Sequence, residues 1–543
     1  MKKRRAIRLL ADLATPCALL LSAACSSSSS SGPASPGTAS SSDGGGGGAF
    51  PDAPPDVDAG GAAPDASSSV ALSVATATIL VAPGETTGLE VSVARVGARA
   101  DVLISVDGLP SGVTAGPLTV AAAANTGKLA LAAAKDAAVG PVTLTIRGTS
   151  SGGSANAVAS IDVRGLPGTP DLGFGTDGAT TVVPFGRTTI ADGDATFVAG
   201  SDATSKAVVV ERLDAAGHAD AAFGTAGMVT ILDAHDPAMA LASDGQLLVA
   251  YSLDTGSNAA STVTVRKYAS SGTLDATFGN AGVATVGFAV DVSTFHYAAG
   301  ITVQPDGKIL IGGFIVRGTD YGHWMELARL SPAGSADVTF GTNGIVAADP
   351  ARPGNAENML VRPDGKIVIA GFDALYRRDA SGAADVSFGT QGGASPAFSF
   401  QPGAALLSNG MLLIAGSTSA RDPNRGLARY TTDGALDPTF GSGGVIRWAS
   451  VDSAGATPTG LLVEDDGTLL VGTVPDSTTT SSHLVRLKAD GTIDPSFGVQ
   501  GFAAVPAGAN AKYSYVGPLF RASHRRVVAT ATTTQNIVSR FWL

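Results

Sequence analysis

Seven copies of one short motif, Asp-x-x-Phe-Gly-x-x-Gly, constrain the fold of this chain more than any other feature of its sequence. The motif has no departures, and its copies are separated by 48 to 62 residues. Self-similarity with a period of about 50 residues is typical of β-propellers and solenoids, in which each repeat is one supersecondary unit. The sequence therefore predicts a repeat protein whose motif phenylalanines are Phe174, Phe223, Phe278, Phe340, Phe388, Phe440 and Phe497.

Each interval between motifs carries a second signature, a hairpin turn followed by an apolar strand. Pro305-Asp306-Gly307-Lys308 precedes the apolar residues 309–311, and residues 363–366 precede 367–369 in the same way. Asp-Gly supplies the positive φ that a two-residue hairpin requires. A third strand ends in a basic–apolar pair such as Arg329-Leu330, and a fourth follows the last glycine of the motif. Four strands in each of seven units predict a seven-bladed β-propeller.

The whole composition agrees with an all-β protein. The chain has 70 glycines and only 6% aromatic residues. Such a composition favours many short strands separated by turns. Hydrophobic residues make up 44% and charged residues 15% of the 543 positions, which is enough to build large cores.

The repeated signatures resemble those of the delta-60 repeat family, whose units carry the same Pro-Asp-Gly-Lys turn, Arg-Leu strand and Asp-x-x-Phe-Gly-x-x-Gly connector. The resemblance covers about residues 170–543. It implies a propeller-like repeat in a bacterial surface or exported protein, but it implies no reaction and no ligand. The organisation of the units is also similar to that of NHL-type propellers, which are mostly interaction platforms.

The two ends of the repeat region are complementary in phase. The region opens with a motif and a fourth strand at residues 180–183, and it ends with three apolar strands within residues 516–542. Pairing the strand from one end with the three from the other would remove two exposed sheet edges. We expect the two ends to share one blade.

A different pattern precedes the repeats, at residues 70–165. Short alternations of apolar and polar residues, such as those at 89–93 and 142–146, are separated by turn signals such as Asp107-Gly108. Six or seven such strands predict a β-sandwich. The segment resembles the immunoglobulin-like modules of bacterial exported proteins, particularly at residues 108–113. Such modules usually serve as spacers or adhesion units.

Residues 1–24 have the basic start and short apolar run of an export signal. Ser22-Ala23-Ala24-Cys25 resembles the lipobox of bacterial lipoproteins, which implies lipidation of Cys25, although an ordinary cleavage site is the alternative. Residues 25–69 are rich in Ser, Gly and Pro and predict a disordered linker. We therefore expect an exported, outer-membrane-anchored lipoprotein that faces either the periplasm or the cell surface.

The net charge of the chain limits the kinds of molecule that it binds. Removal of residues 1–24 takes away five basic residues and one acid, which changes the formal net charge from −11 to −15. Nucleic acid is therefore excluded as a partner. The predicted contact with the membrane is made through the N-terminal lipid anchor, and the ligand is an unidentified protein or glycan.

The motif residues themselves have a structural explanation. An Asp that caps its own turn, a buried Phe and a Gly with positive φ are what a tight connector needs in every repeat. A metal site would need several convergent oxygens, whereas each turn offers mostly one acid, so we predict no metal. The structural motif residues are Asp171, Phe174, Gly175, Asp220, Phe223, Gly224, Asp275, Phe278, Gly279, Asp337, Phe340, Gly341, Asp385, Phe388, Gly389, Asp437, Phe440, Gly441, Asp494, Phe497 and Gly498.

The longest repeat holds a grouping of aromatic and histidine residues. It consists of His296, Tyr297, Tyr321, His323 and Trp324, which we expect in loops on the face opposite the motif connectors. Variable loops on a rigid scaffold often carry function, so this grouping is the candidate ligand-binding site. A metal-binding or catalytic pair and plain loop packing are the alternatives.

The sequence contains no nucleophile elbow and no phosphate-binding glycine loop, so it predicts no catalytic residue and no cofactor. We expect a non-catalytic propeller that binds or scaffolds an extracellular or periplasmic protein or glycan. The alternative is a propeller hydrolase or lyase that acts on an extracellular polymer. Two or more buried, convergent acids or histidines in the central funnel of the propeller would favour the enzyme.

Overall fold

The computed structural model describes residues 68–543, except for 76–77, 98, 136, 183–185, 203–205, 254–261, 289–293, 318–322, 349–353, 372–373, 399, 419–424, 453–455, 475–481, 507–514, 524 and 533–535. The predicted signal, Cys25 and the linker up to residue 67 lie outside the described residues. Within the described ranges the structure is built from strands, and a 3₁₀ turn at Trp448–Ser450 is its only helical element. A search of these ranges finds no helix of the length and hydropathy needed to span a membrane.

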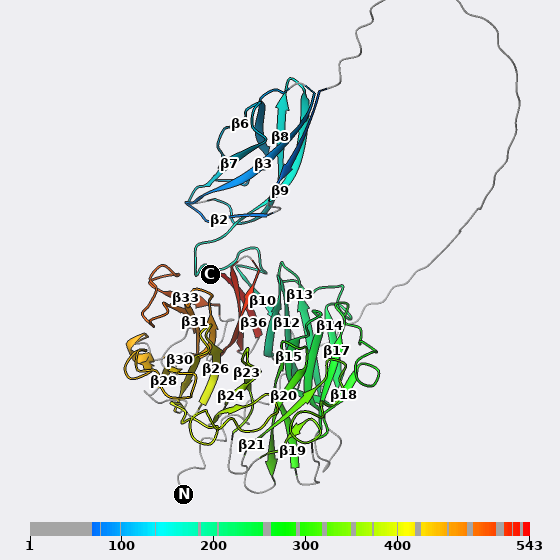
Figure 1. Cartoon of the computed structure of the whole chain (residues 1–543), viewed down its shortest axis with the longest axis vertical. Coiled ribbons are helices and arrows are strands. Elements are labelled where there is room, and N and C mark those ends of the chain that lie inside the picture. Colours follow the sequence, from blue (N-terminus) through cyan, green and yellow to red (C-terminus); the bar gives the residue numbers. More distant parts are fainter. Residues whose placement is uncertain are drawn as a thin grey trace, which may run out of the picture. The chain divides into compact units, whose positions relative to one another are not determined.

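The first nine strands form two sheets with one shared apolar core (Figure 1). The sheet orders are β1-β3-β7-β5 and β2-β9-β8-β4-β6, and β2 runs parallel to β9. More strands form than the six or seven predicted, because short strands such as β5 and β6 have three residues each. The bounds are β1 Ser69–Val74, β2 Thr78–Val81, β3 Thr86–Val96, β4 Val102–Asp107, β5 Val113–Ala115, β6 Leu118–Val120, β7 Thr126–Ala133, β8 Gly140–Ser150 and β9 Gly153–Val163.

The remaining strands form seven separate antiparallel sheets within the described part of the repeat region. Five of them are four-stranded, each with strands consecutive in the chain. The other two are a three-stranded sheet and a four-stranded sheet, named the closing sheet, that combines strands from the start and the end of the repeat region. The bounds are β10 Ala179–Val182, β11 Gly186–Asp192, β12 Ala195–Asp202, β13 Ala207–Leu213, β14 Met228–Leu232, β15 Ala234–Leu241, β16 Leu247–Leu253, β17 Thr262–Tyr268, β18 Val283–Thr285, β19 Thr294–Val303, β20 Ile309–Arg317, β21 His323–Leu330, β22 Ile345–Val346, β23 Asn358–Val361, β24 Ile367–Gly371, β25 Ala374–Arg378, β26 Phe400–Leu406, β27 Leu412–Ser417, β28 Arg425–Tyr430, β29 Val445–Arg447, β30 Thr457–Val463, β31 Leu469–Val474, β32 Ser482–Leu487, β33 Phe502–Val505, β34 Tyr515–Ala522, β35 Arg526–Thr532 and β36 Asn536–Trp542.

The three-stranded sheet β23-β24-β25 departs from the expected four strands. Where a fourth strand is expected, an isolated bridge joins Tyr376 to Gly393. Pro396 follows three residues later and has no N–H to donate to a ladder, which explains why the pairing stops there.

Each sheet buries both of its faces against neighbouring sheets. In β20, Ile309 and Ile311 belong to a core shared with β16 and β17, whereas Leu310 belongs to a core shared with β24. Successive side chains of a strand point to opposite faces, so this alternation places one sheet between two others. The hairpin that leads into β20 turns at Gly307, whose φ of 80° agrees with the expected Asp-Gly turn.

The two ends of the repeat region meet in one sheet. β10 pairs antiparallel with β36, with Thr180 opposite Val538, and the order of the sheet is β10-β36-β35-β34. The predicted pairing of the two ends is therefore confirmed.

The repeated motif forms the same polar clamp in successive sheets. Asp337 Oδ1 accepts hydrogen bonds from the backbone N–H and the hydroxyl of Thr339, and Arg329 Nε donates to Asp337 Oδ2 at 2.7 Å. The Arg329 guanidinium lies 4.4 Å from the centroid of the buried Phe340 ring. Although burial acts in the opposite direction, these hydrogen bonds hold the pKa of Asp337 well below its usual range. Equivalent Arg–Asp–Phe clamps are 377–385–388, 429–437–440, 486–494–497 and 540–171–174.

Candidate functional site

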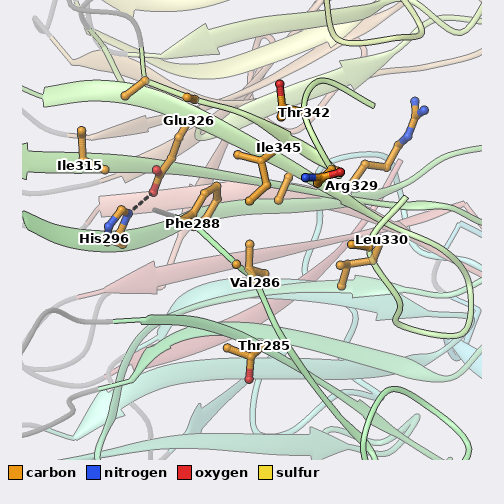
Figure 2. A pocket seen from close by; sticks show the side chains of 17 residues that line it. Thr285, Val286, Phe288, His296, Ile315, Glu326, Arg329, Leu330, Thr342 and Ile345 are labelled. Atoms are coloured by element: carbon orange, nitrogen blue, oxygen red, sulfur yellow. Dashed lines mark hydrogen bonds and ion pairs between the residues drawn. The ribbon is translucent and has the colours of Figure 1, made fainter. Parts of the chain in front are cut away.

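A buried histidine and a buried glutamate meet in the sheet β19-β20-β21-β22. His296 Nδ1 and Glu326 Oε1 lie 2.9 Å apart, at hydrogen-bonding distance (Figure 2). His296 is 2% exposed and Glu326 is 3% exposed. Since charged groups are almost never this deeply buried without a partner, the contact between them accounts for their presence in the core.

Strand register brings these two side chains to the same face of the sheet. His296 in β19 is opposite Ile315 in β20, and Glu326 in β21 is opposite Gly313, two residues from Ile315. Side chains that are two residues apart in a strand, or directly opposite across strands, share a face. The pair therefore bridges β19 and β21 across the strand between them.

The preceding sheet covers the histidine ring. Phe288, three residues after the end of β18, is buried and stacks parallel to His296, with ring centroids 5.6 Å apart and an interplanar angle of 1°. The pair therefore lies where two consecutive sheets meet, and an apolar ring fixes the plane of the imidazole.

A cavity of about 550 Å³ opens beside the pair. His296 and Glu326 are at one part of its lining, and Figure 2 shows Phe288 and Ile345 between them and Leu330. The walls are mostly apolar, and the polar groups on them include Thr285, Thr342, Asn343 and Arg329. A volume of this size with few polar groups is typical of small-molecule and substrate sites.

Burial changes the pKa of Glu326, the acid in this cavity. Desolvation raises the pKa of the Glu326 carboxyl above its usual value, and the hydrogen bond and charge of His296 oppose that rise. A carboxyl with a raised pKa keeps its proton to a higher pH, which is the property of a general acid. No group of three or more His, Cys, Asp or Glu side chains that could hold a metal is found in the described parts of the chain.

An aromatic row lies on the opposite face of the same strands. Tyr297 stacks on Phe314 at 5.0 Å, Phe314 stacks on His323 at 4.6 Å, and Tyr297 lies 5.9 Å from His235. Burial lowers the pKa of the His323 imidazole. The predicted residues Tyr297 and His323 are therefore in one cluster, joined through a phenylalanine that sequence reasoning did not select.

The other predicted residues have different positions. His296 faces away from the aromatic row, Trp324 is half-buried opposite Ile315, and Tyr321 lies outside the described residues. His296, Tyr297, His323 and Trp324 are in strands and not in the loops where they were expected, because β19, β20 and β21 extend further than the apolar pattern indicated.

Glu326 was missed, although the sequence held a signal for it. It stands three residues before Arg329, the basic residue of the clamp. The same position in the other repeats carries uncharged or imidazole side chains: Val209, Thr264, Ala374, Gly426, His483 and Ile537. An acid in the middle of an otherwise apolar third strand was therefore a departure that an alignment of the repeats would reveal.

Three segments of the chain match the model of a family described as a domain of unknown function (DUF5122) β-propeller: residues 304–340, 407–440 and 464–497. Each segment begins at or near an expected hairpin turn and ends at a motif phenylalanine. The chain is a β-propeller protein. No curated protein matches the sequence of this propeller.

Solved structures that are similar to the propeller include several arabinan-degrading enzymes. An α-L-arabinanase of Penicillium chrysogenum has 11% identity and a TM-score of 0.31, with 66% of this chain and 94% of that chain covered. The α-L-arabinofuranosidase Arb93A of Fusarium graminearum has 13% identity and a TM-score of 0.31, with 57% and 93% covered. A quinonprotein alcohol dehydrogenase-like protein of Bacteroides thetaiotaomicron has 11% identity and a TM-score of 0.28, with 79% and 96% covered.

The prediction of a non-catalytic binding or scaffolding protein is wrong in the light of these matches, which agree better with the alternative, a propeller hydrolase. At these identities and TM-scores no residue or substrate is carried over from them. The physical reason for the error is the spacing of the candidate acid–base groups. His296 and Glu326 are 30 residues apart and come together only across β20, so no local motif marks them.

Proposed function

We propose that this β-propeller is a hydrolase that acts on an extracellular polymer and that His296 and Glu326 are its acid–base pair. The observation that carries the proposal is their buried contact at 2.9 Å in the lining of the 550 Å³ cavity. Perturbed acids in a cavity are typical of active sites.

The chemistry follows from the raised pKa of Glu326. Its carboxyl group holds a proton that it donates to the leaving oxygen of the polymer as the bond breaks. Water adds to the other fragment and returns a proton to the pair, so the hydrolysis is balanced. The His296 imidazole accepts or releases a proton at Glu326 Oε1 and stabilises the carboxylate that forms. Trp324, which is half-buried opposite Ile315 on the face that carries the pair, contacts the polymer beside the cavity.

We also propose which kind of β-propeller this chain forms. The seven sheets of residues 170–543 are the blades of a seven-bladed propeller of delta-60-type repeats, and the shared β10–β36 sheet closes the ring. Seven sheets in the chain order of the seven motifs support this arrangement. Residues 70–165 are an immunoglobulin-like β-sandwich, which is supported by two sheets around one core.

The place of action follows from the N-terminal sequence. Residues 1–24 direct export, Cys25 carries the lipid that holds the protein at the outer membrane, and residues 25–69 are the linker to the folded part. The basic start, the short apolar run and the small residues before Cys25 support this proposal. A polymer outside the cell or in the periplasm is then the substrate within reach.

The experiment is a polymer screen with a matched variant. Purified protein from residue 26 onward is incubated with a panel of polysaccharides, and new reducing ends are measured. We expect hydrolysis of at least one polymer, and we expect Glu326→Gln to lower kcat by 100-fold or more because the amide cannot donate the proton. Equal rates for the two proteins, or no hydrolysis of any polymer, would contradict the proposal.

A further inference from the structure

Asp162 in β9 is buried although its side chain points away from the nearest apolar core. Its neighbours Ile161 and Val163 belong to the core that β1–β9 share, and successive side chains of a strand point to opposite faces. Asp162 therefore lies on the outer face of its sheet, yet it is only 1% exposed. A residue of the repeat region covers it: Arg526 Nη2 in β35 donates a hydrogen bond to Asp162 Oδ2 at 3.2 Å, and both side chains are buried.

Arg526 occupies a position that no other repeat fills with arginine. It directly precedes Val527, which is opposite Phe541, the residue after the clamp arginine. Before β20 the same position is Lys308, whose ammonium lies 3.3 Å from the clamp aspartate Asp337. A clamp therefore forms without an arginine at this position. The equivalent residues in the six other sheets of the repeat region are Ala195, Gln246, Lys308, Lys366, Met411 and Thr468.

The guanidinium of Arg526 contacts three aspartates at once. Its Nε lies 3.1 Å from Asp171 Oδ2 of the clamp, Nη2 is bonded to Asp162, and Nη1 lies 3.4 Å from Asp194 Oδ1. Its Cζ also lies 4.4 Å from the centroid of the Trp542 ring. A guanidinium presents several donors in a fixed fork, whereas an ammonium is a single point charge. One side chain therefore completes the clamp and holds β9 at the same time.

The residues between β9 and the first motif complete a turn of the closing sheet. In the sheet β19-β20-β21-β22, the turn after the third strand is closed by Gly334 N–H, which donates to the Ser331 carbonyl at 2.9 Å. The closing sheet makes the same bond between residues from the two ends of the repeat region. Gly168 N–H donates to the Trp542 carbonyl at 2.8 Å, and Trp542 N–H donates to the Thr169 carbonyl at 3.1 Å. The residues before the first motif are therefore part of this sheet and not a free linker.

The same turn also contacts the preceding sheet. Gly498 N–H donates to the Pro167 carbonyl at 2.7 Å, just as Gly279 N–H donates to the Ala333 carbonyl at 2.8 Å. Gly168 has a φ of 82°, and a Cβ atom on it would lie 2.3 Å from the Gly498 nitrogen. A glycine is required there, because both the backbone conformation and the close approach exclude a side chain.

We infer that residues 162–170 lock the β1–β9 sheets onto the closing sheet, and that Arg526 is the side chain that holds the lock. Two domains joined by a short chain change their relative orientation unless a specific interface resists the motion. Here the ion pair at Asp162 and the hydrogen-bonded turn at 167–169 fix both ends of the connecting residues. The β1–β9 sheets therefore move as one body with the repeat region.

The test measures how widely the distance between the two parts varies. The protein from residue 26 onward contains no cysteine, so spin labels are attached at Thr149→Cys in β8 and Thr230→Cys in β14, which are exposed strand positions. Pulsed electron–electron double resonance gives the distribution of distances between the labels. We expect a single narrow distribution in the native background. We expect Arg526→Lys to widen it at least twofold, because the ammonium stays beside the clamp aspartate and leaves Asp162.

Two matched variants separate the lock from a general change of charge. Asp162→Ala should widen the distribution as much as Arg526→Lys does, and the double variant should widen it no further, because both changes remove one contact. Arg147→Lys makes the same exchange in an exposed ion pair with Asp107, and it should leave the distribution unchanged. A native distribution as wide as that of Arg526→Lys, or equal widening by Arg147→Lys, overturns the inference.

A second measurement tests the turn by hydrogen exchange. Gly168→Ala should speed the exchange of the peptide that contains Gly498 at least 10-fold, because the added Cβ forces the turn away from it. Gly245→Ala is the control, since its φ of 77° imposes a similar backbone strain while nothing lies within 4 Å of the added Cβ. Equal exchange of that peptide in the two variants contradicts the lock. Neither measurement depends on hydrolysis, so both decide the inference even if the native protein cleaves no polymer and the proposed function fails.

Discussion

The sheets β19-β20-β21-β22 and β26-β27-β28-β29 each contain the same kind of Arg–Asp–Phe clamp, but they differ in the residues of the third strand that precede it. In both sheets the arginine of the third strand donates to the motif aspartate at 2.7 Å, and its guanidinium lies 4.4 or 4.5 Å from the motif phenylalanine centroid. The two sheets therefore use the same residues to join the third strand to the connector.

Three positions before that arginine the two sheets diverge. One has Glu326, which reaches His296, and the other has Gly426, which faces Gly416. The strands of the first sheet are also longer, with ten residues in β19 and nine in β20 against seven in β26 and six in β27. The residues that repeat therefore define the fold, and a residue that departs from the repeat, such as Glu326, marks the candidate site.

The largest expected effect comes from breaking the closing sheet, in which strands from the two ends of the repeat region pair. Deletion of residues 536–543 removes β36, whose seven side chains are all buried, so that β10 loses its partner strand and β35 pairs only with β34. We expect the melting temperature to fall by more than about 10 °C, because each large apolar side chain lost contributes about 1.5–3 kcal/mol. Scanning calorimetry measures it, and an unchanged transition would contradict the shared sheet.

Breaking one clamp should have a smaller effect. Asp385→Asn leaves the buried Arg377 without its charged partner, which costs about 3 kcal/mol and lowers the melting temperature by about 3–5 °C. The pKa of Asp385 is held well below its usual value by hydrogen bonds from Ser387, Lys366 and Arg377, against the effect of burial. Its stabilisation is therefore present above about pH 4 and is lost as the pH falls, and Asp385→Asn should lose that part of the pH dependence in urea titrations.

Changing Glu326 should affect the melting temperature least, and the pH dependence of its contribution to stability should be opposite to that of Asp385. Burial raises the pKa of Glu326, so the folded state favours its protonated form, and this contribution is present below the ordinary value of 4.5 and is lost as the pH rises. Glu326→Gln cannot ionise. We expect its melting temperature relative to the native protein to increase between pH 5 and pH 8, and a decrease over that interval would contradict the burial of an acid at this position.

The fold was largely predictable because its determinants repeat. Seven exact motifs and the Asp-Gly turns located the sheets, and the phase of the two ends predicted the pairing of β10 with β36. The site was predictable only in part. His296, Tyr297 and His323 were selected for their residue types, but Glu326 and Phe314 depend on strand register and on which face each strand presents, and one sequence read alone does not give those.

The most direct test of the central claim measures stability and hydrolysis together for Glu326→Gln and Asp385→Asn. We expect Glu326→Gln to lower kcat on the polymer found in the screen by 100-fold or more and to leave the melting temperature at pH 7 within about 2 °C of the native value or above it. Asp385→Asn should lower the melting temperature by about 3–5 °C and leave kcat within twofold. The reverse pattern, with hydrolysis retained in Glu326→Gln and lost in a folded Asp385→Asn protein, would contradict the separation of scaffold and site.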